Sequence, residues 1–243
     1  MMLNLAFDAP LATAVIAAIH HGDVEGLKRL LVENPGLATA RIVAANGGER
    51  SLLHIATDWP GHFPNVAATI AALIEAGAEV NPPMSDPPSE TPLHWAASSN
   101  DVEAIDALLD AGADIEAPGA VFTNGTPMSD AVVFAQWKAA RRLLERGART
   151  TLWQAAALGL LDRVEAECAA HPAPSVDEIT NAFWHACRGG QQETARYLLE
   201  QGADLNRIVH GGQTALQAAQ ESGNEALVTW LRSLGAKEAA ELQ

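Results

Sequence analysis

The chain has 243 residues, of which 48% are hydrophobic and only 5% are aromatic. This composition predicts an interior rich in Ala and Leu, which suits closely packed helices better than a sandwich of aromatic and β-branched strands. With 15 Lys and Arg against 30 Asp and Glu, the formal net charge is −15, which disfavours nucleic acid and anionic membranes as partners. A basic protein surface, a cation or a neutral ligand fits this charge.

The N-terminal segment and the two cysteines predict a cytoplasmic protein. Residues 1–21 are largely apolar, but they lack a basic region and are interrupted by Asp8 and Pro10. No apolar run reaches the roughly 18 residues expected of a membrane-spanning helix. Cys168 and Cys187 form neither a zinc motif nor a disulfide framework, so a reducing compartment is expected.

One local pattern recurs along the chain: a capped helix, a tight turn, a second amphipathic helix and a Gly. Its plainest copy begins with TPLHWAASSN, where Thr91 suits the N-cap and Pro92 the first helical turn. The second helix of this copy has one apolar stripe, made of Val102, Ile105, Leu108 and Leu109. Gly112 follows where a left-handed C-cap is needed. Seven copies are predicted, starting near Thr13, Ser51, Thr91, Thr126, Thr151, Asn181 and Thr214.

The TPLHWAA motif and the in-phase segments GAEV, GADI and GADL resemble the ankyrin repeat, whose period is 33 residues. The resemblance covers nearly the whole chain and extends to small bacterial proteins built only of such repeats. It implies an all-α solenoid of about seven helix–turn–helix units with short β-hairpin fingers. It also implies a single domain over residues 1–243, in which the first and last units act as caps and the fingers and first helices line a concave face.

The departures from the repeat pattern are unevenly distributed. The loop at residues 58–65 is longer than its counterparts, and the connection at residues 78–90 is lengthened and rich in proline. Residues 147–154 and 171–179, by contrast, leave no room for a finger. The long fingers therefore lie in the N-terminal half, which predicts a ligand there. The fingerless fifth unit, with Glu167 and Cys168 in place of two leucines, is the predicted weak link.

The resemblance places the partner-binding edge at the ends of the first helices and at the finger tips. Aromatic side chains at such an edge offer a large contact area at low entropic cost. The candidate binding residues are Trp59, His62, Phe63, Trp95, Phe122, Asp130 and Asp58, with Arg50, Asp86 and Glu90 from the fingers. Trp95 also fits a packing role between units, as do Trp137, Trp153, Trp184 and Trp230 within the helical pattern.

Asp130 occupies the position that Trp95 has in the preceding unit. A buried carboxylate is costly unless it is paired, so this residue either caps a backbone group or faces the groove. A carboxylate beside Trp95 would suit a cationic ligand or an Arg side chain. The sequence therefore favours a protein or peptide partner with a basic surface.

An alternative is small-molecule binding or an acid/base enzyme site around His54, Asp58, His62, His94 and Asp130. The resemblance instead implies that His54 and His94 make hydrogen bonds between neighbouring units. Pro60 and Gly61 break the helix after Asp58, so we interpret this segment as a polar turn and expect no metal. The motifs GxSxG, HExxH, GxGxxG and the P-loop are absent, which favours a non-enzymatic scaffold without a cofactor. A monomer is expected, with self-association as a further alternative.

Overall fold

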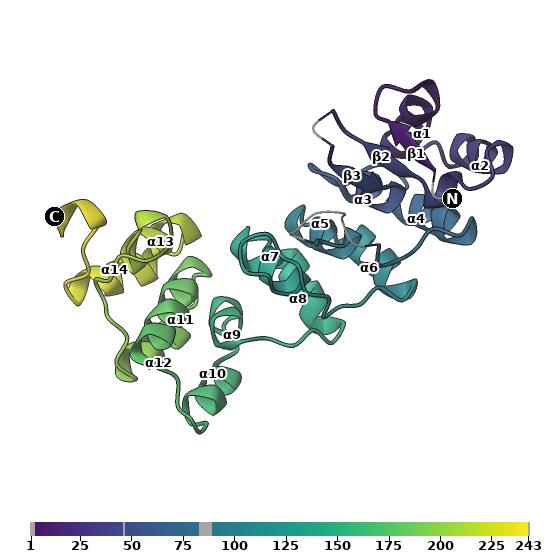
Figure 1. Ribbon diagram of the computed structural model, residues 1–243. Coiled ribbons are helices and arrows are strands. Elements are labelled where there is room, and N and C mark those ends of the chain that lie inside the picture. Colours follow the sequence, from purple (N-terminus) through teal and green to yellow (C-terminus); the bar gives the residue numbers. More distant parts are fainter. Residues whose placement is uncertain (1–2, 46, 83–88, 243) are drawn as a thin grey trace. The chain divides into compact units, whose positions relative to one another are not determined.

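The computed structural model describes residues 3–45, 47–82 and 89–242. It divides the chain into two compact units, Met1–Ala148 and Arg149–Gln243, which we call the N-terminal block and the C-terminal block. Both blocks are built from pairs of antiparallel helices, as Figure 1 shows. The predicted all-α solenoid of helix pairs is therefore confirmed, and the described residues form fourteen α-helices.

The N-terminal block contains four helix pairs. They are α1 (Pro10–His20) with α2 (Val24–Glu33), α3 (Leu52–Thr57) with α4 (Val66–Glu75), α5 (Pro92–Ser98) with α6 (Val102–Asp110), and α7 (Pro127–Val133) with α8 (Trp137–Glu145). A short 3-10 helix, η1 (Leu37–Thr39), follows the first pair. The first helices pack on one another in the order α1, α3, α5, α7, and the second helices in the order α2, α4, α6, α8. Two layers of helices result.

The C-terminal block contains three helix pairs of the same kind. They are α9 (Leu152–Leu158) with α10 (Leu161–Cys168), α11 (Val176–Arg188) with α12 (Gln192–Glu200), and α13 (Ala215–Ser222) with α14 (Glu225–Ser233). The 3-10 helices η2 (His210–Gly212) and η3 (Ala239–Glu241) flank the last pair. Helix α11 lies between α9 and α13.

Alanine and leucine fill the interior, as the composition predicts. In α5, for example, Leu93, Ala96 and Ala97 are almost completely buried. The helices approach closely where side chains are smallest. A Cβ atom on Gly189, the C-cap of α11, would lie only 2.0 Å from the carbonyl oxygen of Ala157 in α9, so this contact requires glycine.

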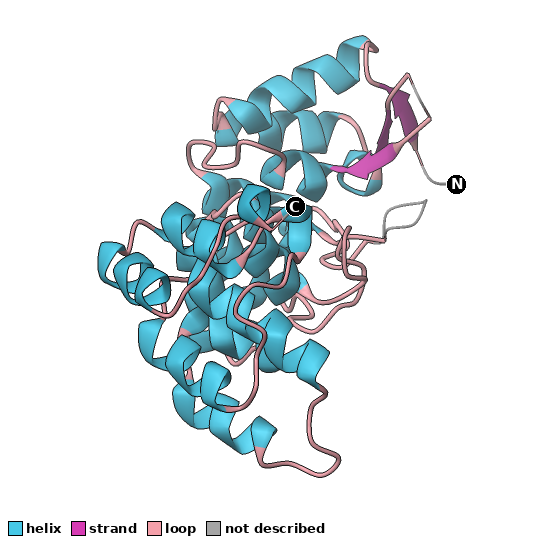
Figure 2. Cartoon of the chain, turned by 90° about the vertical axis from the view of Figure 1, so that its left-hand side faces the viewer, coloured by secondary structure: helices cyan, strands magenta, loops and turns pink. Residues whose placement is uncertain are grey.

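One predicted finger forms a sheet. Among the described residues the only strands are β1 (Asn4–Ala6), β2 (Arg41–Val43) and β3 (Glu49–Ser51), drawn in magenta in Figure 2. Strands β2 and β3 are antiparallel, with Arg41 opposite Ser51, and β1 pairs in parallel with β2. The N-terminal segment thus adds a third strand to the first finger. The later fingers form no strands in the described residues, but tight turns occur in them, closed for example by the Ala120 N–H, which donates to the Gly125 carbonyl at 3.0 Å.

Five of the seven predicted repeat starts are helix N-caps: Ser51, Thr91, Thr126, Thr151 and Thr214. The other two helices begin earlier than predicted. Helix α1 begins at Pro10, ahead of Thr13, and α11 begins at Val176, ahead of Asn181. The reason in α11 is a stronger cap, because the Ser175 N–H donates to Glu178 Oε2 at 2.8 Å and the Glu178 N–H donates to Ser175 Oγ at 3.3 Å.

The single domain predicted over residues 1–243 remains a proposal, because the two blocks are compact units in their own right. If they form one domain, calorimetry of the full chain should show one cooperative transition. Two separate transitions would make the blocks independent domains.

Candidate functional site

The candidate site lies in the N-terminal block, where the loops before α3, α5 and α7 adjoin these helices. Arg50, the residue before the N-cap of α3, forms an ion pair with Asp58 at the other end of that helix, at 2.7 Å between Nη1 and Oδ2. The other Asp58 oxygen accepts a hydrogen bond from the Trp59 N–H at 2.9 Å. The ion pair thus holds the start and the end of α3 together.

Trp95 links this ion pair to the next repeat. The Arg50 guanidinium lies 5.1 Å from the centroid of the Trp95 ring, within the range of a cation–π contact. The indole Nε1–H donates to Glu90 Oε2 at 3.0 Å, and the ring is half-buried. The His54 ring meets it edge-on at 4.9 Å. Trp95 therefore packs against the preceding repeat while part of its ring stays exposed.

Glu90 connects three repeats. Its backbone carbonyl accepts a bond from His54 Nε2 at 3.1 Å, while its side-chain Oε1 accepts the Val121 N–H at 3.2 Å. The loop after α6 comes this close because of Gly119. Its φ is +130°, and a Cβ atom there would lie 2.7 Å from the carbonyl oxygen of Ser89.

Asp130 lies on α7 next to Glu90 and is only 1% exposed. Neither carboxylate oxygen meets a hydrogen-bond donor, since its neighbour is another carboxylate. Burial, followed by the negative charge of Glu90, raises the pKa of Asp130 to about 8. At neutral pH the Asp130 carboxyl therefore keeps a proton, which it can donate to Glu90. We call Arg50, Asp58, Glu90, Trp95 and Asp130 the polar row.

Exposed aromatic side chains accompany the polar row. Trp59, next to Asp58, is 81% exposed, and Phe122, next to Val121, is 70% exposed. The Phe122 ring lies 5.8 Å from that of Phe134, which is itself 41% exposed. Large exposed apolar side chains of this kind are typical of interaction surfaces.

The long loop at residues 58–65 is held in place by polar contacts. His62 has a positive φ of 57°, and its N–H donates to Asp101 Oδ2 at 2.6 Å, while its side chain is exposed. Phe63 stacks on His20 at 4.3 Å and is half-buried. A groove of about 380 Å³ runs past both residues towards Asn100 and Lys138. Of the two aromatic residues in this loop, Trp59 is exposed and Phe63 is half-buried.

His54 and His94 use both ring nitrogens within the fold. In His94, Nδ1 accepts the Thr91 N–H at 3.0 Å, and Nε2 lies 3.3 Å from the Gly125 carbonyl of the following loop. His54 makes the corresponding contacts with Ser51 Oγ and the Glu90 carbonyl. Burial lowers the pKa of each imidazole to about 4, so both are neutral at physiological pH. These histidines link neighbouring repeats.

The structure does not gather the acid/base groups of the alternative hypothesis into one pocket. The two buried histidines are engaged with backbone and hydroxyl groups, and Asp58 is paired with Arg50. Among the described residues, His, Cys, Asp and Glu side chains form no group of three that could hold a metal ion. Asp86, the remaining candidate, lies outside the described residues.

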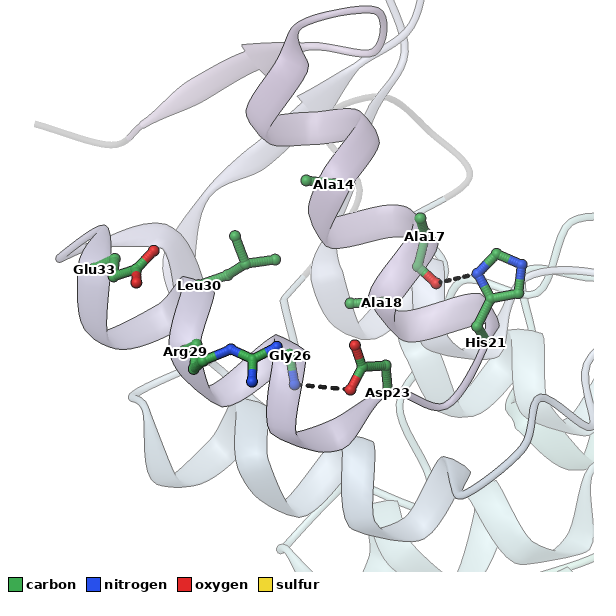
Figure 3. A pocket seen from close by; sticks show the side chains of 9 residues that line it. All are labelled: Ala14, Ala17, Ala18, His21, Asp23, Gly26, Arg29, Leu30 and Glu33. Carbon is green, nitrogen blue, oxygen red and sulfur yellow. Dashed lines mark hydrogen bonds between the residues drawn. The ribbon is translucent and has the colours of Figure 1, made fainter.

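A groove that the sequence analysis missed lies between α1 and α2. Its volume is about 370 Å³, and Figure 3 shows Ala14, Ala17 and Gly26 along it, with Arg29 and Glu33 on α2. Small side chains at i and i+3 on an exposed face were the available signal. Two histidine and two tryptophan rings also cluster in the C-terminal block, where only packing was expected. The Trp184 ring lies 4.9 Å from His185, which is 4.6 Å from Trp153 and 5.3 Å from His210.

Comparison with known proteins agrees with this architecture. The family model of ankyrin repeats (three copies) matches residues 65–152 and again residues 152–240. The chain belongs to the ankyrin repeat family. The ankyrin repeat domain of human ASB11 is similar in structure, with a TM-score of 0.54 and 25% identity, over 92% of this chain and 97% of that domain.

No curated protein matches the sequence. Ankyrin repeats are generally non-catalytic modules that bind proteins. None of the helices in the described part of this chain is both long and apolar enough to cross a bilayer.

Proposed function

We propose that this ankyrin repeat protein is a non-catalytic scaffold that binds a protein or peptide through the polar row and the aromatic side chains beside it. The observation that carries the proposal is the continuous set of contacts from Arg50 through Trp95 and Glu90 to Asp130. These contacts join three successive repeats, so they form one rigid surface that needs no deep pocket.

The electrostatics favour a basic group on the partner. Glu90 is half-buried and already accepts two hydrogen bonds, while Asp130 beside it is protonated because two adjacent carboxylates resist ionising together. A Lys or Arg side chain at Glu90 would stabilise the ionised form of Asp130 and release its proton. Binding of such a group should therefore tighten as the pH rises from 6 to 9.

The exposed aromatic residues supply the contact area. Trp59 and Phe122 flank the polar row, and neither is needed to fill the core, since 81% and 70% of their surfaces are exposed. Such rings anchor interfaces because they bury a large area while few torsions are frozen. The partner is thus expected to carry an apolar side chain next to its basic one.

The alternative of a small-molecule or acid/base site has less support, because His54 and His94 have no free ring nitrogen. We also propose that the protein is cytoplasmic, since a reducing compartment suits its two free cysteines. We further propose that it is a monomer. The likeness of the sequence to small bacterial ankyrin-only proteins leads us to propose a bacterial source.

Selection from a random peptide library tests the proposal. Peptides that bind the wild type are counter-selected against Glu90→Gln and Phe122→Ser, with Val32→Ser on α2 as the matched control because Val32 is 81% exposed. We expect enrichment of peptides with Lys or Arg next to an apolar residue, which bind the control equally well. Enrichment of acidic peptides, or equal retention by all variants, would contradict the proposal.

A further inference from the structure

Arg41 is a buried cation with one guanidinium nitrogen, Nη1, that meets no hydrogen-bond partner among the described residues. It lies in β2, and its residue surface is only 8% exposed. Within the described residues Arg41 forms no ion pair either. A charged group buried in this way is unfavourable by several kcal/mol unless something neutralises it. The chain has 30 acidic residues, so an unpaired arginine inside it calls for an explanation.

The backbone fixes the position of Arg41. Strand β2 is the central strand of the sheet, with Asn4 on one side and Ser51 on the other, both opposite Arg41. The Arg41 N–H also donates to the Leu3 carbonyl at 2.9 Å. The side chain therefore leaves a backbone that is held from both sides, and it cannot move to the surface without loss of this pairing.

A small cavity adjoins the guanidinium. It measures about 30 Å³ and is lined by Arg41 together with Thr39, Ser51, Ala78 and Glu79. A water molecule needs roughly 10–15 Å³ in such a measure, so the cavity has room for about two water-sized groups. Two oxygens of one carboxylate or phosphate group meet this requirement and match the two parallel N–H donors of a guanidinium.

Among the described residues, the neighbouring titratable groups leave the positive charge of Arg41 uncompensated. Burial lowers the pKa of His54, and the positive charge of Arg41 lowers it further, so this imidazole is neutral. Glu79 is the one acidic side chain that lines the cavity, and it is exposed and makes no ion pair with Arg41 in the described structure. An anion from outside the chain is thus the simplest partner for the guanidinium.

We propose that this cavity binds a small oxyanion, a carboxylate or a phosphate group, through the guanidinium of Arg41. The site lies on the first finger and is separate from the polar row, so it stands or falls independently of the proposed partner-binding surface. Its chemistry is also opposite, because the polar row is suited to a cation.

Anion-dependent stability and a direct spectroscopic signal test this site. Thermal unfolding of the full chain is followed in 0–50 mM acetate or phosphate, with chloride at matched ionic strength as the reference. We expect acetate or phosphate to raise the Tm of the wild type by about 3 °C over chloride. Arg41→Met should abolish this rise, and Arg29→Met on α2 should retain it.

The Arg41 Nε–Hε resonance supplies a readout that does not depend on a variant's stability. This resonance is assigned by its absence in Arg41→Lys. In the wild type its chemical shift should change as the oxyanion is added, with the same midpoint concentration as the rise in Tm. A response to acetate alone assigns the site to a carboxylate, and a response to phosphate alone assigns it to a phosphate group. A resonance that stays still, or chloride acting as strongly as either oxyanion, would overturn the proposal. So would Arg29→Met and Arg41→Met losing the effect equally.

Discussion

The two blocks stack their helices in the same way but connect their repeats through different polar groups. In the N-terminal block His54 and His94 each reach from one repeat to a backbone carbonyl of the next loop. In the C-terminal block glutamine holds the same position in α9 and α13. Gln154 accepts the N–H of its own N-cap Thr151, and Gln217 accepts both the Thr214 and the Ala239 N–H. The comparison shows that the helices stack with either residue at this position, and that in the N-terminal block the histidines also bind the loops before α5 and α7.

The blocks also differ in the groups that they expose. The N-terminal block presents charged side chains beside exposed rings, as in Asp58 next to Trp59. In the ring cluster of the C-terminal block, Trp184 and His185 are buried and the Arg188 guanidinium lies 5.6 Å from the Trp184 ring. Burial, and then the proximity of His210, lowers the pKa of His185 to about 3, and the rings around it are largely tryptophan. The difference indicates that the two blocks are suited to different contacts. Under the proposed function, a basic partner would bind the N-terminal block.

The largest effect is expected where a histidine linking two repeats is removed. His94→Ala loses hydrogen bonds at both ring nitrogens and leaves a cavity in a fully buried site, so it should reduce the free energy of unfolding by about 4 kcal/mol. Gln154→Ala in the C-terminal block removes the cap of its own helix and a smaller buried side chain, so the loss should be smaller, about 2 kcal/mol. Urea unfolding measures both. Equal losses would mean that the two blocks are connected in the same way after all.

Acid should weaken the same histidine contacts. The pKa values of His54 and His94 are lowered from 6.5 to about 4 by burial, so their contribution to stability is complete above pH 6.5. It is lost as the pH falls towards 4, because the unfolded chain takes up protons first. Thermal unfolding of His94→Ala should therefore depend less on pH between 6.5 and 4 than that of the wild type. An unchanged dependence would contradict the neutral, buried state of this imidazole.

Asp130 should act in the opposite direction. Its pKa is raised from 3.8 to about 8, so its contribution to stability is complete below pH 4 and is lost as the pH rises towards 8. Asp130→Asn removes this penalty and should stabilise the chain by about 2 kcal/mol at pH 8, with almost no change at pH 4. Glu200→Gln, at the exposed end of α12, is the control. A variant that is less stable than the wild type at pH 8 would refute the protonated carboxyl.

The smallest effect is expected for surface ion pairs. Asp106 on α6 accepts bonds from Arg142 on α8 and from Arg146, the C-cap of α8, at 2.7 Å each. Asp106→Asn should cost under about 1 kcal/mol and lose its effect in 1 M salt. In the C-terminal block Arg207 pairs with Asp177 at a more exposed place, and Arg207→Gln should change stability less. Urea unfolding midpoints at low and high salt distinguish the effects of these two substitutions.

Much of the fold follows from local sequence. At five of the six predicted repeat starts that hold Ser or Thr, Thr91 and Thr214 among them, the helix begins directly after this capping residue. The exception is Thr13, which lies inside α1. The prediction failed at α11 because the pair Ser175 and Glu178 caps the helix earlier. The third strand of the first finger, residues 4–6, was not predicted because it comes from outside the repeat pattern.

The site was less accessible to prediction. The repeat register indicated that Asp130 would lie near Trp95. The residue that contacts both Trp95 and Asp130 is Glu90, which comes from a loop of irregular length. Its position depends on Gly119 and the close approach of two loops. Arg41 gave no signal, since one arginine in a strand says nothing about its burial. Such features depend on which distant segments meet, and a repeat pattern does not fix these contacts where loops vary.

The affinity of a selected basic peptide for variants of the polar row tests the central claim most directly. The claim is that the N-terminal block binds a basic partner through Glu90 and the rings beside it. Isothermal titration at pH 8 would compare the wild type with Glu90→Gln, Trp59→Ala and the control Val32→Ser. We predict at least tenfold weaker binding for Glu90→Gln, about 1.4 kcal/mol, and an unchanged affinity for the control. Equal affinity for Glu90→Gln and the wild type would contradict the claim.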